Sequence, residues 1–426
     1  MKYVYLNIRF CVKNVFCNIQ KCCIFVFCME TLFTTYHTLL KQTNSDFVRY
    51  LMPNIHWHNR LFAIVGARGT GKTTLLLQYI KQNIDISKAL YISLDDLYFS
   101  THRLIDAVRT VWQEGVTHLF IDEVHKYPYA TWAQELKNIY DSYPDIKVVF
   151  SGSSILNIYS GNADLSRRSV SYELFGLSFR EFLEFEGVKK IPAVSLDDLL
   201  KNHVSIAAEI IGDLKILPLF RQYLQTGYFP YFKEDIKTYP LRLLNTVNAV
   251  LESDLPAVEQ IEYASIQKLK RLLAVIATLT PFTPNMSALG AQVEIQRSNL
   301  SKSLILLERA RLLGLLRNID KNLTGLSKPS KIFLDNHNLA YALGENNTNT
   351  GNIRETFFYN QLKAVSKVTD ASKGDFTVNG KYIFEVGGSH KKFSQIADLP
   401  DSYVVADNIE MGFGNKIPLW MFGFLY

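Results

Sequence analysis

Short apolar runs separated by polar turns and helical segments dominate the first half of the chain. Four runs predict buried parallel strands, because each is apolar along nearly its whole length: 61–65, 89–94, 118–123 and 146–150. Apolar spacing over 74–80 predicts a helix directly after the first run. Strands that alternate with helices are typical of an α/β fold with a parallel sheet.

A glycine-rich turn joins the first predicted strand to this helix. It fits the pattern G-x-x-x-x-G-K-[ST] at every fixed position. Its glycines allow backbone N–H groups to surround a β-phosphate, and the helix N-terminus adds partial positive charge. Lys72 reaches the β- and γ-phosphates, and the Thr73 hydroxyl binds Mg²⁺. The predicted nucleotide contacts are Gly66, Ala67, Arg68, Gly69, Thr70, Gly71, Lys72, Thr73 and Thr74.

Two adjacent carboxylates end the predicted strand 118–123. In a P-loop ATPase, Asp122 would hold Mg²⁺ through water, and Glu123 would polarise the attacking water. The predicted ligands of Mg²⁺ are therefore Thr73 and Asp122, with ATP as the nucleotide.

Two further polar groups are candidates for contact with the γ-phosphate. Ser153 follows the predicted strand 146–150 and would sense the phosphate, unless it belongs to an ordinary strand-to-loop turn. Arg168, or second to it Arg167, would stabilise the transition state, in cis or from a neighbouring subunit. The alternative for this arginine pair is a solvated basic turn.

These residues together resemble prokaryotic AAA+-type ATPases related to the archaeal ATPase and STAND groups. The resemblance rests on the segments 120–128, 135–137, 143–144, 151–154, 164–168 and 176–182, and it extends over roughly residues 30–390. It implies a nucleotide-driven switch, ATP rather than GTP, and a C-terminal region with a winged helix and a restriction-endonuclease-like fold. The implied division is 29–182 for the ATPase core, 183–260 for a helical lid, 261–330 for the winged helix and 331–426 for the nuclease-like domain.

Helical spacing in the middle of the chain agrees with a winged helix-turn-helix. Helices are predicted over 266–278, 286–293 and 297–316. The third carries cationic side chains that would contact DNA phosphates, with one more just after it: Arg297, Lys302, Arg309, Arg311 and Arg317. A protein-docking or purely structural module is the alternative, because the same helix is rich in leucine.

Three acidic residues near the C-terminus follow the carboxylate order of the nuclease-like fold. They are Glu355, Asp375 and Glu385, which would hold Mg²⁺ for phosphodiester cleavage. The lysine that normally follows the last acid is absent, although Lys391 or Lys392 could substitute for it. A strict two-residue Asn-Gly turn would also place Asp375 and Glu385 on opposite sheet faces, and only a bulge would bring them together. The expectation is a degenerate nuclease fold.

The composition sets limits on the class of protein. The chain has 426 residues, 48% of them hydrophobic and 20% charged, with a net charge of +6, which permits an anionic partner without requiring one. No apolar run approaches the roughly 20 residues that span a bilayer. All five cysteines lie within residues 1–28, which are interpreted as an upstream extension with a zinc site as the alternative. The remaining residues therefore indicate a cytoplasmic protein.

The sequence thus predicts an ATPase switch whose C-terminal domains engage DNA or a protein partner. An oligomer is compatible with this prediction. Two alternatives remain. One is an ATP-dependent DNA-processing nuclease, and the other is an ATP-binding interaction protein with little turnover.

Overall fold

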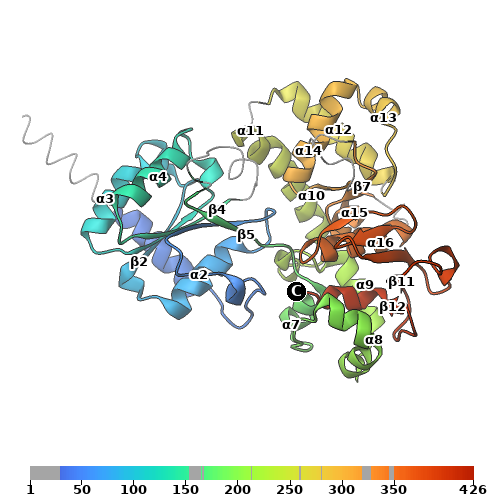
Figure 1. Ribbon diagram of the computed structural model, residues 1–426. Helices are drawn as coiled ribbons and strands as arrows, with labels where there is room; N and C mark the ends of the chain where they lie inside the picture. Colours follow the sequence, from blue (N-terminus) through green and yellow to red (C-terminus); the bar gives the residue numbers. More distant parts are fainter. Residues whose placement is uncertain are drawn as a thin grey trace, which may run out of the picture.

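The computed structural model describes residues 29–152, 165, 167–212, 214–258, 261–279, 281–318, 328–344 and 350–426 (Figure 1). The first half contains a five-stranded parallel sheet with the order β2-β3-β4-β1-β5. Its strands are β1 (Leu61–Val65), β2 (Ala89–Ser93), β3 (His118–Asp122), β4 (Lys147–Gly152) and β5 (Val170–Glu173). The prediction of an α/β fold with a parallel sheet is confirmed.

Helices cover both faces of this sheet. They are α2 (Lys72–Asn83), α3 (Leu104–Gln113), α4 (Trp132–Ser142) and a helix over residues 29–42, with the 3₁₀ turn η4 (Val124–Lys126) after β3. Right-handed crossovers place α2 on one face, and α3 and α4, which contact each other, on the opposite face. All five β1 residues are buried, as expected for a central strand covered on both sides.

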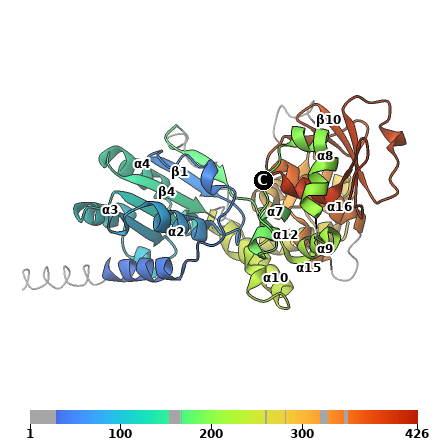
Figure 2. The same ribbon diagram turned by 90° about the horizontal axis from the view of Figure 1, so that it is seen from below.

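A group of helices connects this sheet to the C-terminal half (Figure 2). These elements are α7 (Phe179–Phe185), α8 (Leu196–Ile211), α9 (Ile216–Thr226), η5 (Pro230–Lys233), α10 (Tyr239–Ala249), η6 (Val250–Asp254) and α11 (Leu255–Val258). The turn η6 is a π-helix, and α7 begins with a capping box in which Ser178 and Glu181 satisfy each other's backbone N–H groups.

Three helices and a two-stranded antiparallel sheet follow. They are α12 (Tyr263–Leu279), α13 (Met286–Gln292), α14 (Arg297–Arg309), β6 (Leu313–Leu316) and β7 (Lys331–Leu334). The prediction of one helix over 297–316 is wrong at its end. Ala310 caps α14, Arg311 has a φ of +59°, and the next leucines are buried as a strand against β7.

The last segment forms a mixed sheet with the order β12-β11-β10-β9-β8. Its elements are α15 (His337–Leu343), α16 (Thr350–Lys363), β8 (Val368–Asp370), β9 (Phe376–Val378), β10 (Tyr382–Gly387), β11 (Ser402–Ala406), β12 (Lys416–Pro418) and η10 (Leu419–Phe424). The helix α16 packs on β10 and on η10.

The register of the β9–β10 hairpin differs from the predicted one. Val378 pairs with Tyr382, so the turn contains three residues, 379–381, instead of two. Asn379 and Gly380 both have positive φ, at +54° and +67°, which this turn requires. The paired residues end at Phe376 and Phe384, and the N–H of Asp375, just before β9, donates to the carbonyl oxygen of Phe384 at 2.8 Å. The assumption of a strict two-residue turn is therefore wrong, and the argument that placed these two acids on opposite faces no longer holds.

Two hydrophobic clusters form the interior. One comprises buried residues between Met29 and Leu174, and the other runs from Leu177 to Leu425 and includes Ala67 of the glycine-rich loop. The segments predicted as lid, winged helix and nuclease-like domain thus share one continuous core. Within the described residues, no helix is long and apolar enough to cross a membrane. The cysteines, with the zinc alternative, lie outside the described residues.

Candidate nucleotide-binding site

The glycine-rich loop joins the C-terminal end of β1 to α2, and its glycines adopt conformations that side chains rarely allow. Gly69 and Gly71 have φ values of +86° and +94°. A Cβ atom on Gly69 would lie 2.6 Å from a ring carbon of Tyr231, which belongs to η5. The loop is therefore shaped by its own glycines and is also closely covered by the helical segment, residues 179–258, through Phe229 and Tyr231.

Lys72 is buried at the start of α2 and points back over the loop. Its Nζ donates hydrogen bonds to the carbonyl oxygens of Gly66 and Ala67, both at 3.0 Å. Burial lowers the pKa of Lys72, and this effect is opposed by Glu123 and Asp122. Phosphate oxygens would be stronger partners for this ammonium group than neutral carbonyls.

At the end of β3, the Asp122 carboxylate accepts hydrogen bonds from three hydroxyl groups. Thr73 and Tyr91 both donate to its Oδ2, at 2.5 and 2.9 Å, and Ser151 donates to its Oδ1. The pair Thr73 and Asp122 is the one that the sequence predicted for Mg²⁺. Hydroxyl and carboxylate oxygens that face each other match the hard oxygen ligands of this ion, so the residues present fit it.

Two of these partners, Tyr91 and Ser151, were not identified from the sequence. Ser151 stands one residue beyond the predicted strand 146–150, and the prediction favoured Ser153, which lies outside the described residues. The parallel pairing of β3 with β4 would have pointed to Ser151, because it brings the polar residues at the C-terminal ends of these two strands next to each other.

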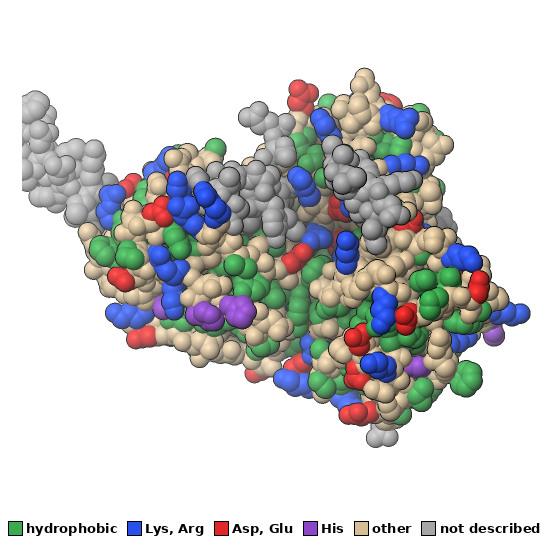
Figure 3. All heavy atoms as spheres, in the orientation of Figure 1, with side chains coloured by type: hydrophobic (Ala, Val, Ile, Leu, Met, Phe, Trp, Pro, Cys, Tyr) green, Lys and Arg blue, Asp and Glu red, His purple; other side chains and the backbone are tan. Residues whose placement is uncertain are grey.

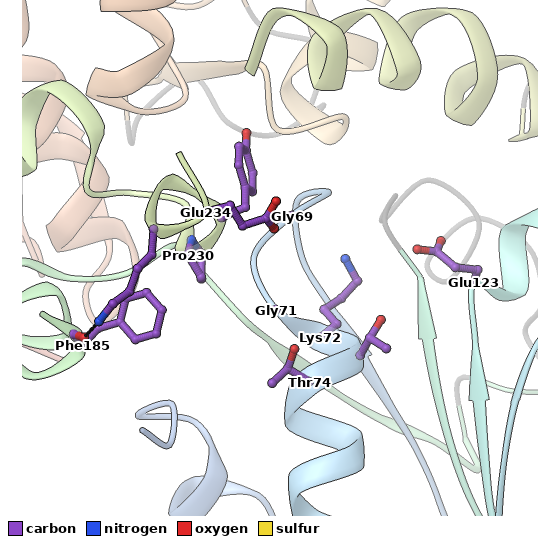
Figure 4. A pocket seen from close by; sticks show the side chains of 11 residues that line it. Gly69, Gly71, Lys72, Thr74, Glu123, Phe185, Pro230 and Glu234 are labelled. Atoms are coloured by element: carbon purple, nitrogen blue, oxygen red, sulfur yellow. Dashed lines mark hydrogen bonds between the residues drawn. The ribbon is translucent and has the colours of Figure 1, made fainter. Parts of the chain in front are cut away.

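Glu123 follows Asp122 in a left-handed conformation, with φ 53° and ψ 43°. Such a backbone is uncommon outside glycine and is frequent at functional sites. In Figure 4 the side chains of Glu123 and Lys72 face each other across a cavity. Burial raises the pKa of Glu123, against the opposing influence of Lys72. A carboxylate with a raised pKa next to a phosphate-binding lysine is suited to act as a general base.

The cavity between loop and helical segment has a volume of about 570 Å³. Its walls come from both halves of the chain: Gly69, Lys72 and Glu123 on one side, Pro230 and Lys233 on the other. A second cavity of about 600 Å³ shares Thr73, Thr74 and Lys233 with the first and extends beneath residues 39–49. The two cavities therefore lie side by side at the start of α2.

Arg49 holds the loop from the opposite side. It is buried, and its guanidinium donates to the carbonyl oxygens of Thr70 and Gly176 and forms an ion pair with Glu181 at 3.0 Å. These contacts connect the N-terminal segment, the glycine-rich loop and the start of α7. This role was not predictable from the sequence, because Arg49 is an isolated arginine between two helical elements and belongs to no motif.

Arg167 and Arg168 come just before β5, which is parallel to β1. They therefore lie at the N-terminal ends of the strands, whereas the glycine-rich loop follows the C-terminal end of β1. Arg167 is exposed, and Arg168 forms an ion pair with Asp141 near the end of α4 at 3.3 Å. This placement does not support contact with the chain's own nucleotide. Contact with the site of a neighbouring copy remains a prediction.

The acidic residues of the C-terminal sheet are brought together but are satisfied by lysines. Lys331 pairs with Glu355 and, at 3.5 Å, with Asp375, while Lys391 pairs with Glu385. Burial raises the pKa of Glu355, although Lys331 opposes it. Within the described part of the chain, no group of three acidic, histidine or cysteine side chains is arranged to hold a metal. The residues therefore do not fit a metal ion in this arrangement.

The basic residues predicted to contact DNA divide into two groups. Arg311 is half-buried and pairs with Glu173 of β5, and Arg317 pairs with Glu308 at 2.6 Å. Both guanidinium groups are thus engaged within the chain, and their contact with DNA phosphates stays a prediction. Their counterparts Arg297, Lys302 and Arg309 are exposed.

Two family models match the chain. A model described as an AAA domain matches residues 58–183, and a model described as a domain of unknown function (DUF8612) matches residues 217–350. The uncharacterized protein MJ1637 of Methanocaldococcus jannaschii is 28% identical over 272 residues, which cover 59% of this chain and 56% of that protein. The match thus spans little more than half of the relative's length.

Several solved structures are similar to parts of the chain. RuvB of Thermotoga maritima is 15% identical with a TM-score of 0.30, covering 68% of this chain and 89% of that chain. A structure on katanin self-assembly is 17% identical with a TM-score of 0.25, covering 38% and 60%. PCH-2 of C. elegans is 18% identical with a TM-score of 0.23, covering 43% and 47%. These scores are too low to argue from, so the similarity to an AAA domain rests on the family model that matches residues 58–183.

Proposed function

We propose that this chain is a Mg²⁺-dependent ATP hydrolase of the AAA+ type that acts as a nucleotide-driven switch. One observation carries the proposal. Thr73 and Asp122 meet by hydrogen bond next to a cavity into which Lys72 and Glu123 both project. An AAA domain over residues 58–183 supports the same activity.

Each residue has a definite task in this proposal. Lys72 exchanges its loop carbonyls for phosphate oxygens and neutralises their charge, while Thr73 and Asp122 hold the metal. The metal, when bound, neutralises charge between the β- and γ-phosphates. Glu123 accepts the proton of the attacking water, which its raised pKa favours. Arg168, or in second place Arg167, stabilises the transition state in a neighbouring copy, so oligomerisation belongs to the proposal.

The C-terminal half is the proposed output of the switch. The helices α12, α13 and α14 and the strands β6 and β7 follow the order of a winged helix, and Arg297, Lys302 and Arg309 are exposed on it. In Figure 3, basic side chains appear at the upper right, where α13 and α14 lie in the same orientation. DNA or an acidic protein surface is the proposed partner of this region.

The second candidate function is an ATP-dependent nuclease. The three-residue turn favours it, because the argument that Asp375 and Glu385 lie on opposite faces no longer holds and both carboxylates raise the pKa of Glu355. The lysine pairs oppose it, and we propose that the domain is degenerate. Incubating supercoiled DNA with the wild-type chain and Mg²⁺, and comparing it with Asp375→Ala, tests this. Cleavage by the wild type alone would establish the nuclease.

The main experiment compares ATP hydrolysis by the wild type and by Glu123→Gln, with ATP binding measured in parallel. The proposal expects both proteins to bind ATP and only the wild type to turn it over. Equal, background-level turnover with intact binding would favour the third candidate, an ATP-binding interaction protein. Loss of binding in the wild type would reject the site altogether.

A further inference from the structure

A buried carboxylate from the C-terminal half reaches the nucleotide site. Asp254 is the last residue of η6 and is 1% exposed. It forms ion pairs with three basic residues of the ATPase core: Arg68 at 3.1 Å, Lys126 at 2.6 Å and His125, whose Nε2 lies 3.6 Å away. Arg68 belongs to the glycine-rich loop, and the other two follow the acidic end of β3.

His125 connects this carboxylate to the proposed general base. Its side chain is almost completely buried, and its Nδ1 lies 3.3 Å from Oε2 of Glu123, while its other ring nitrogen faces Asp254. One imidazole therefore lies between a carboxylate of the active site and a carboxylate of the helical segment. Moving Asp254 would remove the support that orients His125, and with it a neighbour of Glu123.

The charge of Asp254 is also felt at the site. Burial alone would raise the pKa of Asp254, but hydrogen bonds from His125 and Lys126 hold this pKa well below its ordinary value. The carboxyl group is therefore anionic at neutral pH. Its negative charge raises the pKa of both Lys72 and Glu123 as a smaller contribution. A phosphate group entering the cavity would meet this charge and would compete with it for Arg68.

The backbone that carries Asp254 is itself unusual. The turn η6 is π-helical, a conformation that is rare and often found at functional sites. It packs against α10, α11 and α12, so it links the nucleotide site to the first helix of the three-helix unit. Its other acid, Glu252, points to the surface and pairs with Lys270, so the turn contains one acid directed inward and one directed outward.

We propose that Asp254 is a positioning residue of the hydrolysis site, supplied by the C-terminal half, and that turnover depends on η6 being seated on the ATPase core. This inference rests on the proposed ATPase function. Asp254 orients Glu123 through His125. Its ion pairs with Arg68 and Lys126 also keep the positive charge of these side chains away from the nucleotide. Any partner that displaces η6 would thus lower the rate of ATP hydrolysis and, at the same time, raise the affinity for the nucleotide.

Asp254→Asn tests this, because it removes the charge and keeps the size of the side chain. The expected result is ATP binding that is tighter than in the wild type and a kcat that is lower by about tenfold, because Glu123 is then held less well in place for the reaction. His125→Gln is expected to lower kcat with a smaller effect on ATP binding. The control is Glu252→Gln on the same turn, which is expected to change neither quantity. Binding is measured with a fluorescent ATP analogue, and folding by thermal denaturation.

The outcomes are separable. Unchanged binding and kcat in Asp254→Asn would overturn the inference, and the proposed function would stand. A fall of binding and kcat together with the melting temperature would show a structural role only, which also overturns it. If the wild type binds no ATP, the proposed function fails and the inference fails with it.

Discussion

Arg49 and Glu181 form a buried ion pair with an Nε–Oε1 distance of 3.0 Å, although 132 residues separate them in the chain. Arg49 also donates to the carbonyl oxygen of Thr70, and Glu181 accepts from the backbone N–H of Tyr50 at 2.7 Å. One pair of side chains thus fixes the position of the phosphate loop relative to the first helix of the C-terminal half. The position of the glycine-rich loop and the placement of α7 are therefore linked through one ion pair.

The first prediction concerns this pair. Arg49→Ala leaves the Glu181 carboxylate buried without its partner, which costs about 3–5 kcal/mol of the free energy of unfolding. Chemical denaturation measures the loss. Arg109→Ala is the control, because its pair with Asp106 is exposed and is worth less than about 1 kcal/mol. Equal effects of the two variants would contradict the importance given to the buried pair.

The second prediction concerns Ser151, which donates to Asp122 from β4. Ser151→Ala removes a partner that orients a metal ligand, and such changes typically cost about 10–100-fold in metal affinity or activity. The Mg²⁺ concentration for half-maximal ATP hydrolysis should therefore rise. Ser169→Ala is the control, since that hydroxyl donates to the backbone carbonyl of Leu165 and not to Asp122. An unchanged Mg²⁺ requirement in Ser151→Ala would argue against this arrangement.

The third prediction is a pH dependence of stability. Burial lowers the pKa of His337 from its ordinary 6.5 to about 4, while its Nδ1 lies 2.8 Å from the carbonyl oxygen of Leu224. Between these pH values the unfolded chain binds a proton that the folded chain does not. The free energy of unfolding should therefore fall by about 3 kcal/mol as the pH drops from about 6.5 to about 4.

His337→Asn keeps a donor for Leu224 and cannot titrate, so its stability should depend less on pH in this window. Urea denaturation at a series of pH values measures the difference in slope. His390→Asn, at an exposed position, is the control and should keep the wild-type slope. Parallel pH profiles for all three proteins would contradict the prediction.

The fourth prediction concerns the lysine that joins Glu355 to Asp375. Lys331→Met leaves two neighbouring carboxylates without their shared cation, so the variant should lose stability and regain part of it when Mg²⁺ or Ca²⁺ is added. Thermal denaturation with and without these ions measures this. Lys373→Met, which affects an exposed pair with Asp398, should show neither effect. Stability of Lys331→Met that is independent of divalent ions would show that the acids cannot form a metal site.

The fifth prediction concerns the exposed face of α14. If DNA is the partner, replacing Arg297, Lys302 and Arg309 with Ala should weaken binding and reduce the salt dependence by about one unit of slope per lost phosphate contact. Binding of a DNA duplex is measured over a range of salt concentrations. Affinity that does not change with salt in the wild type would point to a protein partner instead.

Local sequence patterns were sufficient for the ATPase core. The strand before Gly66, the helix after it and the acidic end of β3 are contiguous features, and the structure has them as β1, α2 and β3. Contacts between distant segments were not predictable in this way. Ser151, Tyr91 and Arg49 are single residues without a motif, and they reach the site only because the strand order and the helix packing bring them there.

The hairpin of β9 and β10 shows the same limit at short range. Asn379 and Gly380 correctly indicated a turn, but the number of residues in it depends on pairing with β8 and on the backbone N–H of Asn379, which binds Lys367. A shift of one residue reverses the face of every side chain. The proximity of Asp375 to Glu385 was therefore decided by the whole sheet.

The sequence by itself determined the phosphate loop and the carboxylates next to it, because backbone geometry and metal chemistry require those residue types at fixed local spacing. Only the tertiary structure decided that Asp254 faces His125 and Arg68, and that Lys331 and Lys391 pair with the C-terminal acids. Such pairs depend on how helices and sheets pack over long sequence separations. Their energies come from burial, which no local pattern records.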